Sequence, residues 1–483
     1  MPIQLRVVQR VVGALLTLFS ASMLTPVLVG LLYRDGAILP FLGAFLATLA
    51  VGLALFLPVR GRQGQLRLRD GFVVVVLFWA VLGIFGGLPF LLYGPLELSV
   101  AAAVFESMSG LTTTGATLIV GLDALPHSIL FYRQQMQWLG GMGIIVLAIA
   151  VLPMLGIGGQ QLFRAETPGI SKDKLTPRIA QTAKALWYIY LGLTVACSVA
   201  YALAGMSVFD AITHAFSTVA IGGFSTHDNS IGHFDSSLIE MIATLFMFIS
   251  GANFALHFAA ARNLDARSYV ADEEFRVYTA ILLALTAITA GYLYLAQASD
   301  AKDSFVNGIF HVVSIGTTTG FTSEAYFEWP TFLPVLLLFA SFIGGCTGST
   351  GGGMKVLRVL LLFKQGQREL RRLLHPNAKI MVKIGGKAMS NPMIDVVWGF
   401  FAAYVALLTI MLLLMMAAGL DQESAFSAVV ACLNNLGPGL GVVAANYSTL
   451  GDFELVVLSF AMLFGRLEIF TLLVLFTPAF WRR

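Results

Sequence analysis

Four short turns rich in glycine and threonine hold the residues of this chain best suited to binding an alkali-metal cation. They read "SGLTTTGAT" (109–117), "STVAIGGFS" (217–225), "SIGTTTGFTS" (314–323) and "CLNNLGPGLG" (432–441). The string "TTTG" offers hydroxyl and carbonyl oxygens, which are hard ligands, and no thiolate or imidazole for a transition metal. Glycine adopts positive φ readily, so successive carbonyl groups can point toward one axis. Four such turns around an axis would form a cation-selective filter.

A short apolar segment precedes each turn and is the element that must position it. These segments are roughly 12–15 residues long, too short to cross a bilayer. Each begins with an acid, which stabilises a helix N-terminus and leaves the negative end of the helix dipole facing the turn. The four acids are Glu97, Asp210, Asp303 and Glu423. We therefore predict four short helices that enter from one side, stop near mid-depth and aim their C-termini at one site.

A second polar stretch, "IGGCTGSTGGGMKVLR" (343–358), interrupts an apolar segment. It is not a phosphate-binding loop, because Gly353 is followed by Met354 and Lys355 and no strand precedes it. A packing kink is one interpretation, since glycines let helices approach closely. Ten residues of Gly, Ser, Thr and Cys exceed what packing requires, however. Arg466 lies inside another apolar segment, where an ionisable residue marks either a functional site or a structural partner for an acid.

The composition is that of a membrane protein. Hydrophobic residues make up 58% of the chain and charged residues 11%, with a mean hydropathy of +0.84, whereas a soluble domain averages about 25% charged residues. A span needs about 20 apolar residues. Ten segments qualify, roughly 8–32, 38–58, 71–94, 131–157, 180–204, 237–261, 277–297, 331–363, 392–419 and 453–480. No soluble domain remains that could bind nucleic acid, and no catalytic set of residues converges, so we expect no enzymatic activity.

Lysine and arginine predict the orientation. They concentrate in the loops near 59–70, 158–179, 262–276 and 364–391, which share one side with both termini if there are ten spans. Only Arg34, Arg133 and Lys302 fall on the opposite side. The positive-inside rule makes the terminus side cytoplasmic. Acids that follow the turns on the outer side predict a mildly negative vestibule, and His227 and His233 are interpreted as ordinary surface histidines.

The predicted fold is an all-α integral membrane protein of ten transmembrane helices. Four pseudo-symmetric repeats, each made of a span, a short pore helix, a filter turn and a second span, surround one pore and follow two extra spans. The predicted divisions are 1–70 for the two leading spans and 71–179, 180–276, 277–391 and 392–483 for the repeats.

The turns, the two leading spans, the Gly-rich break and "GRLEIFT" near the C-terminus together resemble the membrane subunit of TrkH/KtrB-type potassium transporters, and the leading spans favour the TrkH branch. The resemblance covers essentially the whole chain. It implies potassium uptake across the bacterial inner membrane through a filter of backbone carbonyls. Aligned on the turn glycines, these belong to Thr113, Thr114 and Gly115, to Ala220, Ile221 and Gly222, to Thr318, Thr319 and Gly320, and to Asn435, Leu436 and Gly437. A serine at the first glycine is associated with sodium transport in this superfamily, so Gly115 favours potassium.

The resemblance also implies a mobile intramembrane loop that obstructs the path beneath the filter, with Arg466 beside it. The residues of this gate are Gly344, Gly345, Thr347, Gly348, Ser349, Thr350, Gly351, Gly352, Gly353 and Arg466. It further implies a homodimer and a cytosolic nucleotide-binding regulatory subunit similar to TrkA. Potassium is the transported ion, and no organic cofactor is expected.

Two alternative functions remain open at this stage. A cation-coupled symporter with alternating access is typically built from inverted repeats, whereas the four repeats here enter and leave on the same sides. A potassium-translocating subunit driven by a partner ATPase would carry no phosphorylation machinery of its own, and neither does this chain.

Overall fold

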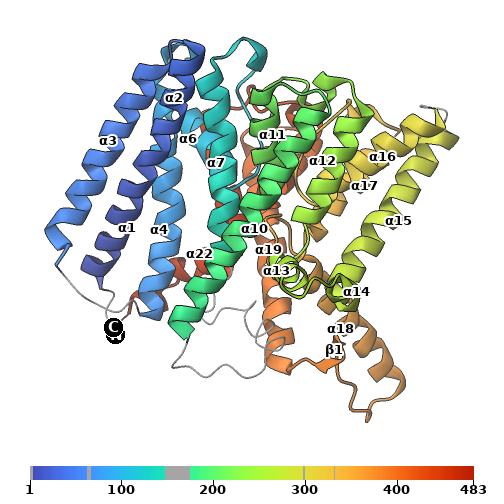
Figure 1. Cartoon of the computed structure of the whole chain (residues 1–483). Helices are drawn as coiled ribbons and strands as arrows, with labels where there is room; N and C mark the ends of the chain where they lie inside the picture. The colour runs from blue at the N-terminus through green and yellow to red at the C-terminus, as the bar shows by residue number, and fades with distance from the viewer. Residues whose placement is uncertain (1–3, 62–66, 147–174, 297–299, 331, 483) are drawn as a thin grey trace.

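The computed structural model describes residues 4–61, 67–146, 175–296, 300–330 and 332–482. Their regular secondary structure is almost entirely helical (Figure 1). The strands among them are β1 (Lys383–Ile384) and β2 (Lys387–Ala388), which form a small antiparallel hairpin. The predicted all-α class is therefore confirmed.

The N-terminal region is a pair of long helices. α1 (Leu5–Ser20) continues through a short 3-10 turn into α2 (Leu24–Tyr33), and α3 (Ile38–Phe56) runs back beside it (Figure 1). Two glycines allow this approach. A Cβ on Gly13 would lie 2.7 Å from the backbone nitrogen of Phe56, and one on Gly52 would lie 2.8 Å from the backbone nitrogen of Thr17. Small residues at such crossings let two helix backbones pack closely in a membrane.

Four of the remaining helices directly precede the turns, and we call them the short helices: α6 (Val100–Leu111), α11 (Val208–Ala220), α16 (Ala301–Gly316) and α20 (Gln422–Leu433). The others are α4 (Leu68–Gly86) with α5 (Leu88–Leu92), α7 (His127–Val146), α10 (Leu175–Leu203), α12 (Ser237–Ser250) with α13 (Phe254–Asn263) and α14 (Arg267–Ala271), α15 (Glu273–Leu295), α17 (Leu333–Ile343), α18 (Val356–Leu374), α19 (Asn391–Ala417), and α21 (Asp452–Arg466) with α22 (Phe470–Leu473) and α23 (Pro478–Trp481).

Three of the four acids predicted to lie at the starts of the short helices are found there. Asp210, Asp303 and Glu423 lie in the first turns of α11, α16 and α20. Glu97 does not belong to α6; it lies before the N-cap, Ser99, in a left-handed conformation. The carboxylate at this helix start comes from a distant element instead, because the Ser99 hydroxyl donates to Asp452 Oδ1 at 2.5 Å.

The span count of ten stays a prediction. Within the described residues, six helices are long and apolar enough to cross a membrane, and two bent pairs, α12–α13 at 92° and α21–α22 at 109°, raise the number to eight. The predicted span 131–157 passes Val146 into 147–174, which lies outside the described residues, as does most of the predicted loop 158–179. The predicted span 331–363 is broken into α17 and α18.

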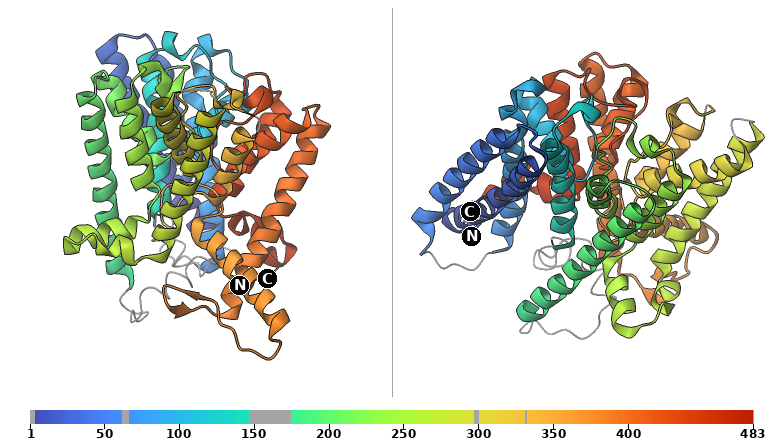
Figure 2. Two further views of the ribbon diagram at one scale, coloured as in Figure 1. Left: turned by 90° about the vertical axis from the view of Figure 1, so that its right-hand side faces the viewer. Right: turned by 45° about the horizontal axis from the view of Figure 1, so that its top comes forward.

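The two chain ends lie side by side (Figure 2). They occupy the end of the molecule where α18 and the β hairpin also lie, away from the loops that follow the short helices (Figures 1 and 2). The predicted loop 364–391 begins as helix, because α18 extends to Leu374 before the hairpin.

Gly52→Leu should separate α1 from α3, because its Cβ position is already in contact with Thr17. Forcing extra side-chain atoms into a packed contact costs about 1–3 kcal/mol of stability, so we expect a lower melting temperature of the detergent-solubilised protein. Gly192→Leu on α10 is the matched control, since a Cβ there meets nothing within 4 Å. Equal melting temperatures for the two variants would contradict the close crossing.

Candidate functional site

Each short helix ends in the same turn. A left-handed residue lies one or two positions beyond the end of each helix: Thr113 (φ 52°), Ile221 (54°), Thr318 (70°) and Asn435 (53°). Its N–H donates to the carbonyl three residues earlier, at 3.0, 3.1, 3.0 and 3.2 Å respectively. The next N–H donates to the carbonyl five residues earlier, at 2.9, 2.8, 2.7 and 2.8 Å. These paired bonds form a Schellman motif, which satisfies the last carbonyls of a helix.

The left-handed residues carry strain. Three of the four, Thr113, Ile221 and Thr318, are β-branched, and β-branched residues rarely adopt positive φ. Such conformations cost about 1–3 kcal/mol each and persist where the surroundings fix them, often at functional sites. The same strained residue at the end of four helices indicates that the backbone path after it is required.

Two residues further along, a glycine with positive φ lies against the neighbouring turn. These glycines are Gly115 (82°), Gly223 (77°), Gly320 (84°) and Gly437 (99°). A Cβ on Gly115 would lie 2.1 Å from the Gly222 oxygen, one on Gly223 2.1 Å from the Thr319 oxygen, one on Gly320 2.1 Å from the Leu436 oxygen, and one on Gly437 2.6 Å from the Thr114 oxygen. The contacts run from the first turn to the second, third and fourth and back to the first. They therefore close a ring of four carbonyl oxygens.

This ring corrects the predicted register of the second turn by one residue. The sequence alignment pairs Gly222 with Gly115, but torsion angles, hydrogen bonds and ring contacts all pair Gly223 with Gly115 and Gly222 with Thr114. Ala220 then corresponds to Thr112, the last residue before the left-handed position. The sequence "AIGG" holds two adjacent glycines, so spacing alone could not decide between them.

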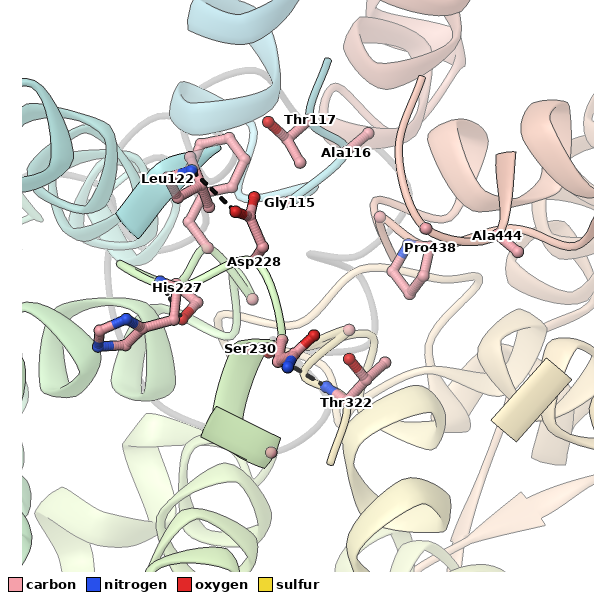
Figure 3. Close-up of a pocket in the computed structure, with 18 of the residues that line it drawn as sticks. Gly115, Ala116, Thr117, Leu122, His227, Asp228, Ser230, Thr322, Pro438 and Ala444 are labelled. Carbon is pink, nitrogen blue, oxygen red and sulfur yellow. Dashed lines mark hydrogen bonds between the residues drawn. The ribbon is translucent and has the colours of Figure 1, made fainter. Parts of the chain in front are cut away.

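A cavity of about 410 Å³ lies over the ring, on the side of the loops that follow the turns. All four ring glycines line it, together with Thr117, Asp228, Thr322 and Pro438 (Figure 3). We call this cavity the vestibule. Asp228 joins the loop after the second turn to the loop after the first, because its two carboxylate oxygens accept from the N–H groups of Gly121 and Leu122, both at 3.0 Å.

Buried polar side chains behind the turns hold the chain that leaves them. In the first three repeats the residue seven positions before the left-handed one is polar: Glu106, His214 and His311. In the fourth repeat it is Ala428. Glu106 accepts from Leu118 N–H at 3.1 Å, His214 Nε2 lies 2.9 Å from Ser225 Oγ, and His311 Nε2 accepts from Ser323 N–H at 3.4 Å. In the fourth repeat the neighbouring Ser427 hydroxyl takes this role: it donates to the Leu440 carbonyl and accepts from the Leu440 N–H.

Arg133 on α7 joins the first two turns. Both it and Glu106 have fully buried side chains and form an ion pair at 2.8 Å. Its other nitrogens donate to the Ser225 carbonyl at 3.1 Å and to Thr117 Oγ1 at 2.9 Å. Sequence analysis assigned Arg133 only to the outer side and did not single out Glu106. Gln137, one turn further along α7, donates to the Gly222 carbonyl at 2.5 Å and accepts from Phe224 N–H.

The Gly-rich segment passes beneath the turns and touches three of the four repeats. Gly352 N–H donates to Thr318 Oγ1 at 2.7 Å, and Gly353 N–H donates to the Asn434 carbonyl at 3.0 Å. Thr350 Oγ1 donates to the Val219 carbonyl at 3.1 Å. A Cβ on Gly352 would lie 1.9 Å from the Asn434 oxygen, which explains why this position is glycine. The segment is thus bound to the C-terminal ends of α11, α16 and α20.

Arg466 lies against this segment at the end of α21. Its Nη1 donates to the Thr350 carbonyl at 3.1 Å, while Nε and Nη2 are buried and have no hydrogen-bond partner among the described residues. Arg466 does not pair with Glu468, which instead accepts from Arg358 at 2.5 Å. Lys355 donates to the Gly351 carbonyl within the segment itself. Gly140 lies inside the continuous helix α7 and packs on the Leu111 carbonyl.

Comparison with known proteins identifies the family of the chain. Residues 39–483 fit the sequence model of the TrkH family, described as a cation transport protein. The chain belongs to the TrkH family. It is 57% identical to the Trk system potassium uptake protein TrkH of Vibrio parahaemolyticus, over 99% of this chain and all of that protein. It is 54% identical to the protein of the same name from Escherichia coli K12, over 99% of each chain.

The fold agrees as well. The crystal structure of the potassium transporter TrkH from Vibrio parahaemolyticus superposes with a TM-score of 0.93, at 55% identity, covering 99% of this chain and all of that one. The family resemblance found in the sequence is therefore confirmed, and a multi-pass membrane protein follows from the family and from the apolar helices.

Breaking the Arg133–Glu106 pair should destabilise the protein strongly, because either partner alone would be a buried, uncompensated charge. The cost of removing one partner is about 3–5 kcal/mol. We expect Glu106→Gln and Arg133→Met each to lower the melting temperature, and the double variant to melt well above the value that additive losses would give. Glu369→Gln is the control, since its pair with Arg372 is about half exposed and such pairs contribute about 0–1 kcal/mol. Additive losses in the double variant would show that the two side chains are not coupled.

Proposed function

We propose that this protein takes up potassium across the bacterial inner membrane through a filter formed by its four turns. The closed ring of glycine-to-carbonyl contacts carries the proposal, because it brings four oxygen-lined turns to one axis beneath a cavity. The printed names of the relatives, potassium uptake proteins at 54–57% identity over full length, support potassium as the ion.

The proposed ligands are backbone carbonyls in the register of the ring. They belong to Thr113, Thr114 and Gly115, to Ile221, Gly222 and Gly223, to Thr318, Thr319 and Gly320, and to Asn435, Leu436 and Gly437. Carbonyl oxygens replace the water shell of a dehydrating ion. Each short helix adds the negative end of its dipole, equivalent to about half an elementary charge. Four such ends favour a cation without placing a carboxylate in its path.

In the proposed gate, residues 344–353 lie below the ring and obstruct the path. The support is positional: the segment is bound to three turn-bearing helices, and Arg466 holds its Thr350 carbonyl. A buried guanidinium with two nitrogens free of hydrogen bonds among the described residues places positive charge beside the path and disfavours cations there. Moving the segment together with Arg466 would open the pore.

Further parts of the proposal rest on the sequence and the family. They are the division into two leading spans and four repeats, ten spans with both termini cytoplasmic, a homodimer of pores, and a cytosolic nucleotide-binding regulatory subunit similar to TrkA. The basic stretch at 364–391 is the proposed docking region for that subunit.

Gly115→Ser tests the filter. A Cβ at this position meets the Gly222 oxygen at 2.1 Å, so the ring must widen or distort and its preference for potassium should fall. We expect a loss of discrimination against sodium of about tenfold or more, equivalent to about 1.4 kcal/mol. The measurement is uptake of potassium and sodium by an uptake-deficient bacterium, together with growth at low potassium.

Gly121→Ser is the matched control for this substitution. Gly121 also has positive φ (74°), but a Cβ there meets nothing within 4 Å. It therefore reproduces the backbone strain without touching the ring. If Gly115→Ser and Gly121→Ser transported both ions alike, the filter assignment would be wrong. Strict stoichiometric coupling to a second ion, with no steady current in a planar bilayer, would favour alternating access instead.

Deletion of residues 348–351 tests the gate. This removes the Thr350 contacts to the Val219 carbonyl and Arg466 but keeps Gly352 and Gly353, which touch the turns. We expect conduction that no longer closes, with the preference for potassium over sodium unchanged. Deleting Gly385 and Gly386 from the exposed β hairpin turn, measured in the absence of the regulatory subunit, is the control for shortening the chain. Altered preference without leak would place the segment in the filter rather than the gate.

A further inference from the structure

Two histidines and an aspartate from different repeats meet at the rim of the vestibule. Asp123 belongs to a 3-10 turn after the first filter turn (Leu122–Ala124), and His233 to another after the second (Ser230–Phe234), with His227 just before it. One potential ligand atom from each lies within 4.8 Å of the others. The side chains of Asp123 and His233 are 51% and 44% exposed, whereas that of His227 is 17% exposed. External solutes therefore have access to a partly buried group.

The two imidazoles face the same carboxylate oxygen. His227 Nδ1 pairs with Asp123 Oδ1, and His233 Nδ1 lies 4.0 Å from that oxygen. The rings are parallel within 2°, with centroids 3.4 Å apart. Two imidazolium cations stacked so closely would repel each other, so the arrangement favours at least one neutral ring. A neutral ring keeps a lone pair available for a metal ion.

A second carboxylate faces the far side of His227. His227 Nε2 is buried and has no hydrogen-bond partner among the described residues, yet it lies 3.5 Å from Asp210 Oδ1. Asp210 is itself fixed, since it accepts from Thr226 Oγ1 at 2.8 Å and from Ser207 Oγ at 2.7 Å. Metal-binding histidines commonly donate their second N–H to a carboxylate, which sets the tautomer. Asp210 would hold the proton on Nε2 and leave Nδ1 free as the ligand.

We propose that Asp123, His227 and His233 form an outward-facing site for a divalent transition metal such as Zn²⁺. Two imidazole nitrogens and one carboxylate oxygen are a zinc ligand set, and three protein ligands leave a fourth position for water. Mg²⁺ and Ca²⁺ prefer oxygen ligands and would bind poorly. Binding requires the two rings to tilt out of their parallel stack so that both Nδ1 lone pairs converge on one ion.

An ion at this site would act on the transported cation through its charge. His227 and Asp228 both line the vestibule whose floor is the ring of four glycines (Figure 3). A divalent cation at the rim offsets the carboxylates there and lowers the local concentration of entering cations. This effect on uptake rests on the proposed function, whereas metal binding does not.

Protons should compete with the metal. A metal ligand must be deprotonated, so the affinity for zinc should increase as the pH rises.

The binding test uses the purified full-length protein in detergent and titration calorimetry with ZnCl₂. We expect His233→Gln and Asp123→Asn each to weaken binding by about tenfold or more, since even second-sphere losses cost about 10–100-fold. His375→Gln, an exposed histidine beyond the C-terminus of α18, should bind as the wild type does. MgCl₂ should give no saturable heat. Equal zinc affinities in His233→Gln, Asp123→Asn and His375→Gln would overturn the site.

The uptake test measures rubidium entry into proteoliposomes with and without external ZnCl₂. Inhibition of the wild type and of His375→Gln, with relief in His233→Gln, is the expected result. Equal inhibition of all three would show that zinc acts elsewhere and would overturn the proposed link. Absence of uptake by the wild type without zinc would contradict the proposed function, and calorimetry would then decide the metal site independently.

Discussion

The predicted filter depends on close approaches between a glycine in one turn and a carbonyl oxygen in the next, where an added Cβ would lie 2.1–2.6 Å from that oxygen. Four of them, from Gly115, Gly223, Gly320 and Gly437, close a ring within one chain. Any other residue type would distort the ring, because a Cβ at these positions would overlap the oxygen and because all four glycines have positive φ. The ring also needs the turns to leave their helices in one direction. The four Schellman motifs impose that direction, at the cost of β-branched residues in left-handed conformations.

Polar groups buried around the ring keep it rigid. Carbonyl oxygens that face each other repel, and in a low-dielectric interior this repulsion is not screened by water. The buried pair of Arg133 and Glu106, with the amides of Gln134 and Gln137 on the same helix, anchors the first and second turns. Asn435 links the fourth turn to the first by donating to Thr114 Oγ1 at 3.0 Å. Such networks rigidify a site where their members are satisfied, as the side-chain groups of Glu106, Arg133 and Gln137 are.

The sequence predicted the fold class, the family and the four turns, because these depend on local composition and on a repeat that is visible in one dimension. The register of the second turn could not be predicted, since "AIGG" offers two glycines and only the neighbouring Thr319 carbonyl selects Gly223. Glu106 and Arg133 were missed as a pair because they lie 27 residues apart on different helices. The start of α6 was misplaced for a similar reason, since its nearby carboxylate, Asp452, belongs to the last repeat. For the second turn and for α6, a contact between repeats overrode the local signal.

The proposed gate is hydrogen-bonded directly to turns of the proposed filter, and this affects how opening could be controlled. The segment 344–353 is held by Gly352 on Thr318, by Gly353 on Asn434 and by Arg466 on Thr350. A hydrogen bond contributes about 0.5–1.5 kcal/mol net, or about 1.5–3 with a charged donor, so releasing the segment costs a few kcal/mol. Shifting an equilibrium from 1:99 to 99:1 requires about 5.5 kcal/mol of differential binding. The proposed regulatory subunit could supply that amount. Because Gly352 and Gly353 are bound to Thr318 and Asn434, opening the segment would also relax the turns that carry Thr318 and Asn435.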